Sequence, residues 1–237
     1  MAKYTVHLKG RREIAAGTTA FYFQKPVGFS FKPGQFVELS FLAPHESDTH
    51  PFSIASAPHE EDLVIVTRMR GGAMKQVLGT MPLGTEVMVD GPYGDFVLHK
   101  NAARPAVFLT GGIGITPFRS MAVSAAHEQL PHKIFLVYAN RRPEDAPFLE
   151  ELHALTSENP HYRFIPTMTR IGTHDASWSG ERGHITKEML LRYIPDINGP
   201  MYYSAGPQGM VAAMRAVLNN AGVDDDDIRT EEFSGYW

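Results

Sequence analysis

A glycine-rich turn is the feature of this sequence that most clearly suggests ligand chemistry. Gly112, Gly114 and Pro117 form the pattern G-x-G-x-x-P. The apolar run Pro105–Leu109 before it predicts a buried strand, and Arg119–Glu128 after it predicts a helix whose first turn includes Pro117. Glycine lets a backbone approach a pyrophosphate, while a helix N-terminus offers unpaired N–H groups and the positive end of its dipole. The pattern indicates a nucleotide phosphate site, with a purely structural tight turn as the alternative.

Two segments nearer the N-terminus also combine ligand-binding side chains. His50-Pro51-Phe52-Ser53 places an imidazole, an aromatic ring and a hydroxyl close together. Alternate residues of an extended chain share a face, so this segment fits a strand that lines a ligand groove, or an ordinary edge strand. Residues 68–75 join two arginines to a glycine pair at a predicted helix start, which suits a phosphate or a solvated basic turn.

Composition excludes several other kinds of chemistry. The 237 residues carry a net charge of −4 and no cysteine, which rules out disulfides, thiolate nucleophiles and Cys-ligated iron–sulfur or zinc sites. The 11 histidines show no metal-ligand spacing, so no metal site is predicted. The acidic balance disfavours a nucleic-acid surface, and no run reaches the roughly 20 apolar residues that span a bilayer. We expect a soluble, monomeric, cytoplasmic protein without a signal segment.

The first half of the chain has the alternating pattern of short β-strands. Turn residues separate these strands, and helical spacing over Gly72–Leu83 predicts one helix among them. The pattern predicts an antiparallel barrel or sandwich. The predicted strands are Tyr4–Leu8, Thr19–Phe23, Phe36–Phe41, Leu63–Arg68 and Glu86–Asp90.

The second half alternates strands and helices, which predicts an open parallel sheet with ligands at the carboxyl ends of its strands. The change of pattern places a domain boundary between residues 100 and 101. Gly206-Pro207 marks a second glycine-rich strand exit, which strengthens the case for a nucleotide. Further predicted strands are Lys133–Tyr138, Tyr162–Thr167, Met201–Ser204 and Asp227–Glu232, and further helices are Glu144–Ser157, Thr186–Tyr193 and Gly206–Asn220.

In this order the motifs resemble the ferredoxin–NADP⁺ reductase superfamily of flavoenzymes, over nearly the whole chain. The likeness rests on Pro33-Gly34-Gln35-Phe36, His50–Ser53, residues 68–75, Gly91-Pro92-Tyr93-Gly94, Gly111–Phe118, Gly206-Pro207 and Glu231-Glu232-Phe233. It implies an FAD-binding β-barrel at residues 1–100 and an NAD(P)-binding α/β domain at residues 101–237. It also implies an NAD(P)H-dependent reductase that passes hydride to FAD and then electrons to a separate acceptor.

The resemblance also implies a flavin site in the first half. His50 and Phe52 stand where Arg and Tyr are usual, a variant similar to the NADPH oxidase and ferric reductase branch. Phe52 is then expected on the isoalloxazine ring, Ser53 near flavin N5 and His50 near the phosphates. FAD is favoured over FMN. The remaining flavin-site residues implied are Pro51, Val66, Arg68, Gly72, Ala73, Met74 and Lys75.

A nicotinamide site and a flavin cover are implied in the second half. The nucleotide is expected at Thr110, Gly111, Gly112, Gly114, Thr116, Pro117, Gly206 and Pro207. Arg170 and Arg182 match the place of a 2′-phosphate site, which favours NADPH over NADH, or they form an exposed basic loop. Ala205 replaces a cysteine that many relatives carry. Glu231 is expected near nicotinamide, Phe233 over the flavin, and Tyr236 or Trp237 at its adenine, unless the tail is frayed.

The electron acceptor is open at this point. A ferredoxin- or flavodoxin-type carrier and an oxygenase component are the expected partners, and a loose basic cluster offers a docking surface at Arg11, Arg12, Lys25 and Lys32. A ferric or free-flavin reductase is one alternative. A redox or dinucleotide sensor without turnover is an alternative of another class.

Overall fold

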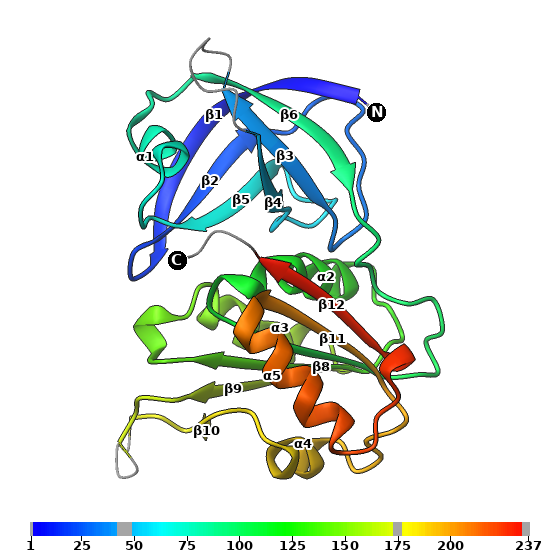
Figure 1. Ribbon diagram of the computed structural model, residues 1–237. Coiled ribbons are helices and arrows are strands. Elements are labelled where there is room, and N and C mark those ends of the chain that lie inside the picture. Colours follow the sequence, from blue (N-terminus) through cyan, green and yellow to red (C-terminus); the bar gives the residue numbers. More distant parts are fainter. Residues whose placement is uncertain (1, 42–48, 173–176, 234–237) are drawn as a thin grey trace. The chain divides into compact units, whose positions relative to one another are not determined.

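The computed structural model describes residues 2–41, 49–172 and 177–233. Contacts within the chain divide it into two compact units (Figure 1). Unit 1 comprises residues 1–97 together with 116–124, and unit 2 comprises residues 98–115 and 125–237. Part of one helix therefore belongs to the first unit although the sequence around it belongs to the second.

Unit 1 contains a six-stranded antiparallel sheet, as the first half of the sequence predicts. The strand order is β4-β3-β6-β1-β2-β5. Beyond β4 the Ala55 N–H donates to the Val64 carbonyl of β5 over 2.8 Å, so the two edges of the sheet meet as in a barrel. The elements are β1 (Ala2–Ala15), β2 (Thr18–Gln24), β3 (Phe36–Phe41), β4 (His50–Ser53), β5 (Asp62–Arg68), α1 (Ala73–Thr80) and β6 (Glu86–Tyr93).

Residues 116–124 belong to helix α2 (Ile115–His127) and pack within unit 1. The ring centroid of Phe118 lies 5.7 Å from that of Phe96. Met121 approaches Gly34 so closely that a Cβ on that glycine would lie 2.3 Å from the Met121 Cε atom. These apolar contacts explain why the middle of the helix belongs to the same compact unit as the strands of the first half.

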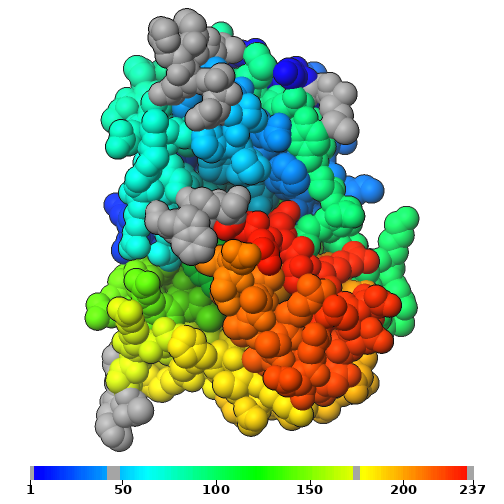
Figure 2. Space-filling model, viewed as in Figure 1, coloured from blue at the N-terminus to red at the C-terminus, as the bar shows by residue number. Residues whose placement is uncertain are grey.

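Unit 2 contains a six-stranded sheet whose pairings are all parallel, as predicted for the second half. The order is β10-β9-β8-β7-β11-β12. Helices α4 and α5 share one apolar cluster with the sheet, and Figure 2 shows the outer side of α5, in orange, open to solvent. The elements are β7 (Ala106–Gly111), β8 (Ile134–Asn140), α3 (Leu149–Glu158), β9 (Tyr162–Met168), β10 (Glu181–Arg182), α4 (Lys187–Tyr193), β11 (Met201–Pro207), α5 (Gln208–Asn219) and β12 (Ile228–Phe233), with 3₁₀ turns at Gly112–Gly114, Pro143–Asp145 and Asp225–Asp227.

Two predicted helix starts differ from the structure, and β10 was not predicted. Helix α3 begins at Leu149 rather than residue 144, because Phe148 adopts the left-handed region with φ 61° and interrupts the helix. Helix α5 begins at Gln208, because Gly206-Pro207 continues β11 in register with β12. Helix α2 begins at Ile115, before the apolar pattern that starts at residue 119, and Pro117 lies in its first turn as expected. The period of the apolar residues gives the helix but not its first turn.

A buried network of polar groups lies near the start of unit 2. The His99 Nε2–H donates to the Arg104 carbonyl over 2.9 Å, since a carbonyl oxygen can only accept. His99 Nδ1 then accepts from the Tyr203 hydroxyl at 3.0 Å, and that oxygen accepts the His99 backbone N–H at 2.9 Å. His132 Nε2 donates to the His99 carbonyl over 2.8 Å. The network ties residues 99–104 to β11.

Within the described residues, no helix has the length and apolar character needed to cross a membrane.

Candidate functional site

The predicted flavin strand is an edge strand of unit 1. β4 pairs with β3 in a register that places Ser53 opposite Phe36 and His50 opposite Leu39. His50 and Ser53 are half-buried and Pro51 is exposed, so three of the four side chains are accessible to a ligand. The Phe52 ring is only 7% exposed and lies in the apolar cluster of the sheet. Its stacking on a flavin stays a prediction, and its burial gives it a packing role as well.

The segment before α1 has the geometry of an anion site. Gly71 and Gly72 adopt φ 56° and 75°, and a Cβ on either would meet no atom within 4 Å, so the space beside them is open. Gly72 caps α1 without a side-chain hydrogen bond, so backbone N–H groups of the first turn point to an open side. Burial lowers the pKa of the Lys75 ammonium nearby. An FAD phosphate at these groups stays a prediction.

Not every residue predicted for the flavin site is accessible. Val66 and Met74 are buried at 3% and 7% exposure, and Met74 belongs to the same apolar cluster as Phe52. Arg68 is half-buried, and Ala73 is exposed at the start of α1. Backbone groups, rather than the side chains of Val66 and Met74, are what this region can offer a ligand.

The glycine-rich turn of unit 2 is held by β8. The Gly112 N–H donates to Asn140 Oδ1 over 3.2 Å, and the Tyr138 hydroxyl donates to the Gly112 carbonyl over 3.0 Å. Gly112 adopts φ 55°, which favours glycine. Sequence reasoning missed Tyr138 and Asn140, although their place at the carboxyl end of the neighbouring strand could have indicated them.

The two glycine-rich strand exits of unit 2 lie against one another. A Cβ on Gly114 would stand 2.2 Å from the Ala205 carbonyl oxygen and 2.7 Å from Gly206 Cα. The Thr110 hydroxyl donates to the same Ala205 carbonyl over 2.9 Å, so it serves the fold. Thr116 is 2% exposed and Pro117 is buried. The structure therefore brings Gly112, Gly114 and Gly206 together.

The two predicted 2′-phosphate residues have different surroundings. The Arg170 side chain is exposed where the chain leaves β9, and its backbone N–H donates to the Arg141 carbonyl over 2.9 Å. The Arg182 guanidinium donates to the carbonyls of Gly172 and Trp178 at 3.2 and 2.8 Å. The Arg182 guanidinium is therefore bonded to backbone within the chain, whereas the Arg170 side chain is exposed, and a 2′-phosphate site at either residue stays a prediction.

The predicted C-terminal site is described only as far as Phe233. β12 aligns Glu231 with Ala205 and Phe233 with Pro207, so both residues lie beside the second glycine-rich exit. Glu231 and Phe233 are half-buried. Tyr236 and Trp237 lie outside the described residues.

Two members of the predicted basic docking cluster have internal partners. Arg11 Nη1 donates to the Leu78 and Met81 carbonyls at 3.3 and 2.9 Å, at the carboxyl end of α1. Lys25 donates to the carbonyls of Pro58 and Glu60. Arg12 and Lys32 are exposed. The cluster is therefore a weaker docking surface than its sequence suggests.

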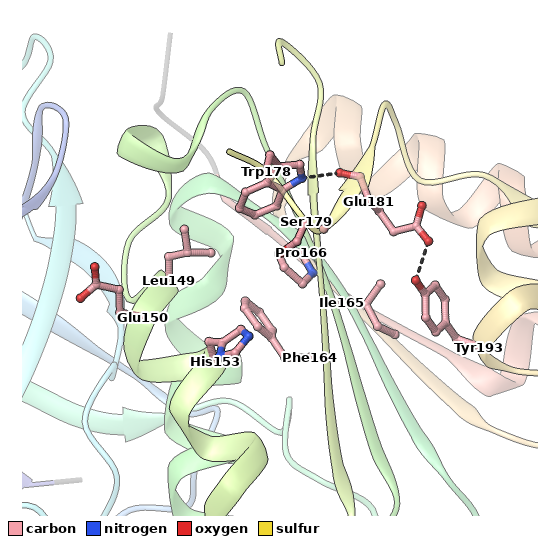
Figure 3. A pocket seen from close by; sticks show the side chains of 11 residues that line it. Leu149, Glu150, His153, Phe164, Ile165, Pro166, Trp178, Ser179, Glu181 and Tyr193 are labelled. Atoms are coloured by element: carbon pink, nitrogen blue, oxygen red, sulfur yellow. Dashed lines mark hydrogen bonds between the residues drawn. The ribbon is translucent and has the colours of Figure 1, made fainter. Parts of the chain in front are cut away.

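A pocket of about 630 Å³ lies elsewhere in unit 2, between α3, strand β9 and the edge strand β10 (Figure 3). Phe164, Pro166 and Trp178 give it apolar walls. Glu181 accepts hydrogen bonds from Tyr193 and Arg192 at 2.5 and 2.6 Å, so its carboxylate supports the edge of the sheet. The lining contains none of the residues predicted to bind a nucleotide.

Comparison with known proteins agrees with this arrangement. Residues 12–97 match the family described as FAD-binding domain, and residues 108–216 match the family described as oxidoreductase NAD-binding domain. Ferredoxin–NADP reductase B of Sorangium cellulosum is 30% identical over 214 residues, covering 86% of each chain. The chain belongs to the ferredoxin–NADP reductase family. The predicted superfamily, fold class and pair of cofactors, FAD and a nicotinamide dinucleotide, are confirmed.

Two further comparisons concern a longer protein and a solved structure of the same fold. The glycine betaine monooxygenase reductase subunit of Chromohalobacter salexigens is 30% identical over 91% of the chain, which spans only 60% of that relative. A ferredoxin–NADP⁺ reductase from Neisseria gonorrhoeae with bound FAD and NADP has the same fold, with a TM-score of 0.81, 22% identity and coverage of 97% and 98% of the two chains. The individual site residues stay predictions.

Proposed function

We propose that this protein is an NAD(P)H-dependent FAD reductase that passes electrons to a separate acceptor in the cytoplasm. The observation that carries the proposal is that one chain combines an FAD-binding stretch with an NAD-binding stretch whose glycine-rich exits are packed together. One protein can then bind both the hydride donor, NAD(P)H, and the hydride acceptor, FAD. Hydride transfer between them needs alignment of two rings rather than a catalytic triad or a metal.

The residues of this chain would bind and orient the cofactors. Bound FAD supplies the hydride acceptor and the electron store. The open N–H groups at the start of α1 are suited to its phosphates. The Ser53 hydroxyl, half-buried at the end of β4, is our candidate for a hydrogen bond at the flavin ring. Gly112 and Gly114 let the backbone approach a dinucleotide, and Glu231 is our candidate for a residue that orients its nicotinamide end.

The acceptor is a separate molecule in this proposal. The sequence holds no cysteine, so it cannot ligate an iron–sulfur cluster of the plant type. Its relatives carry the names ferredoxin–NADP reductase and monooxygenase reductase subunit. A ferredoxin-type carrier or an oxygenase component is therefore the proposed partner.

A visible spectrum tests the proposal directly. Purified protein supplied with FAD should turn yellow, and anaerobic NADPH or NADH should bleach it at a rate that supports turnover. Adding ferredoxin, flavodoxin, ferric chelate or free flavin to the reduced protein then ranks the acceptors. Protein that binds no FAD, or that keeps its colour with both nucleotides, would contradict a reductase.

Arg170 offers a test of the preference for NADPH. The variant Arg170→Gln should raise KM for NADPH about tenfold and leave KM for NADH unchanged, because a charged hydrogen bond to the 2′-phosphate is lost. Arg182→Gln should affect stability more than this ratio, since its guanidinium donates to two carbonyls. Equal KM changes for both nucleotides in Arg170→Gln would remove Arg170 from the 2′-phosphate site.

A further inference from the structure

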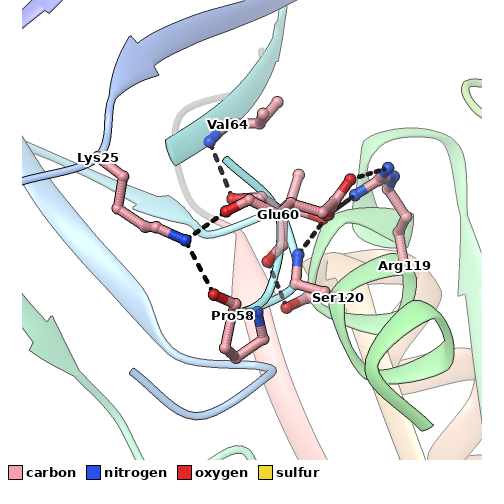
Figure 4. A network of polar contacts seen from close by, with 9 residues as sticks. Lys25, Pro58, Glu60, Val64, Arg119 and Ser120 are labelled. Carbon is pink, nitrogen blue, oxygen red and sulfur yellow. Dashed lines mark hydrogen bonds and ion pairs between the residues drawn. The ribbon is translucent and has the colours of Figure 1, made fainter. Parts of the chain in front are cut away.

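One charged side chain of α2 acts within unit 1. Arg119 lies in the stretch matched as an NAD-binding domain, yet residues 116–124 belong to unit 1. Its side chain is 9% exposed and reaches the loop of residues 54–61 between β4 and β5 (Figure 4). A segment matched to one cofactor therefore contacts the loop that follows the predicted binding strand of the other.

The Arg119 guanidinium makes three hydrogen bonds to this loop. Nη1 donates to the Ala55 carbonyl at 2.8 Å and to Glu60 Oε2 at 2.7 Å, and Nη2 donates to Glu60 Oε1 at 2.9 Å. Burial acts to raise the pKa of Glu60, but the hydrogen bonds and charge of Arg119 outweigh it and hold that pKa below its ordinary value. The planar fork fits a carboxylate in a way that lysine cannot reproduce.

Other side chains complete the support of the loop. Ser120 Oγ donates to the Ser56 carbonyl at 2.7 Å, and Ser56 Oγ accepts the Val64 N–H at 3.0 Å. Lys25 donates to the Pro58 and Glu60 carbonyls from the other side. Carbonyls of the loop are thus held by side chains of α2 and of the segment after β2. Backbone N–H groups of Ile54 and Ala55 hold the start of the loop by donating to the Gln35 and Val64 carbonyls, and these side chains hold the rest of it.

We propose that Arg119 is a positioning residue for FAD, acting through loop 54–61 on the strand that carries Phe52 and Ser53. The proposal rests on the binding of FAD at β4 in the proposed function. Arg119 itself needs no contact with the flavin. Ser120 has the same role with a smaller contribution, since it supplies a single neutral hydrogen bond.

The test measures flavin binding and flavin environment in the full chain. We expect Arg119→Ala to raise the dissociation constant for FAD about tenfold or more, because small displacements of positioning groups are costly. At saturating FAD it should change the visible circular dichroism of the flavin and lower kcat, with KM for the nicotinamide nucleotide unchanged. Arg119→Lys should recover part of each effect. Ser120→Ala should show the same pattern more weakly, which keeps the test available if Arg119→Ala does not fold.

Arg104 provides the matched control. Its guanidinium donates to the Gly199 and Pro200 carbonyls at 2.7 and 2.9 Å and pairs with Asp227, so it repeats the same chemistry in unit 2. Arg104→Ala should lower thermal stability but leave flavin affinity and dichroism unchanged. If Arg119→Ala and Ser120→Ala lose stability like Arg104→Ala and keep wild-type FAD affinity and dichroism, the positioning role is overturned. Wild-type protein that binds no FAD overturns the proposed function and this role together.

Discussion

The two candidate binding regions differ in what holds them in place. In unit 1 the loop after β4 is held by donated hydrogen bonds from Arg119, Ser120 and Lys25. In unit 2 the glycine-rich turn is held by hydrogen bonds of Gly112 to Asn140 and Tyr138 and also by close backbone packing of Gly114 against the Ala205 carbonyl. Charged and hydroxyl side chains hold the first region, whereas the second also requires that Gly114 carry no side chain.

This difference determines how each region responds to change. A close-packed turn tolerates no added atom, because interiors are packed to crystal density. A loop held by a buried ion pair tolerates small changes of shape, but it fails when one partner loses its charge. Mutations that add side-chain volume should therefore destabilise the glycine-rich turn of unit 2, and mutations that remove a charge should destabilise the loop of unit 1.

The largest expected effect is steric and falls in unit 2. Gly114→Ala should lower the free energy of unfolding by about 3 kcal/mol or more, since its Cβ would overlap the Ala205 carbonyl and force two strand exits apart. Urea denaturation measures the loss. Gly209→Ala is the control: a Cβ there meets nothing within 4 Å, so alanine should be neutral or stabilise α5 by up to about 1 kcal/mol. Equal effects at both positions would refute the packing argument.

The second effect is electrostatic and falls in unit 1. Glu60→Gln should cost about 2 kcal/mol at pH 7, because the buried Arg119 loses its charged partner. Because the pKa of Glu60 lies below its ordinary value, the unfolded chain takes up the proton first as pH falls. The wild type therefore loses this stability as pH falls from about 4.5 through the folded pKa. Unfolding curves between pH 7 and 3 should show a smaller acid loss in Glu60→Gln; parallel curves would contradict the assignment.

The smallest effect comes from the hydrogen-bond network of His99, Tyr203 and His132 in unit 2. Burial lowers the pKa of His99, with smaller contributions from the charges of His132 and Arg229. The unfolded chain then binds a proton before the folded chain does, so stability falls as pH drops below about 6.5 and levels off below the folded pKa. The slope cannot exceed about 1.4 kcal/mol per pH unit, the limit for one proton.

His99→Gln measures this contribution. An amide can still bond to the Arg104 carbonyl, but it does not titrate. The variant should therefore lose the dependence of stability between pH 6.5 and the folded pKa while Glu60→Gln keeps it. Hydrogen exchange of the β11 amides at pH 7.5 and 5.5 assigns the effect to unit 2. An unchanged pH profile in His99→Gln would show that another group titrates in this range.

Local pattern explains why much of the fold could be predicted. The alternation in Phe36–Phe41 predicts β3 with the same bounds as in the structure, because half-buried strands have a period of two. Thr186 caps α4, and its hydroxyl accepts the Met189 N–H at 3.2 Å, as its residue type predicts. Glycine spacing likewise identified the turn at Gly112 and Gly114. Each of these signals lies within a few residues of its effect.

The missed features depend on residues far apart in sequence. Glu60 and Arg119 are separated by 59 positions, and neither residue alone distinguishes a buried pair from a solvated surface charge. Asn140 supports Gly112 only because β8 lies beside β7. Phe148 adopts the left-handed conformation that delays the start of α3, and no glycine at that position indicates it in the sequence. Tertiary neighbours, rather than local propensity, decide all three.

Because residues 116–124 of α2 belong to unit 1, the chain cannot be divided at a single point without breaking contacts of that unit. A cut at the predicted boundary between residues 100 and 101 would separate the strands of unit 1 from Phe118, Arg119 and Met121. The fragment would expose the apolar surface that Phe118 covers and leave Glu60 without its cation. Recombination between related genes at that point would likewise join halves whose contacts evolved apart. The module that chimeras should exchange is therefore a noncontiguous one, residues 1–97 with 116–124.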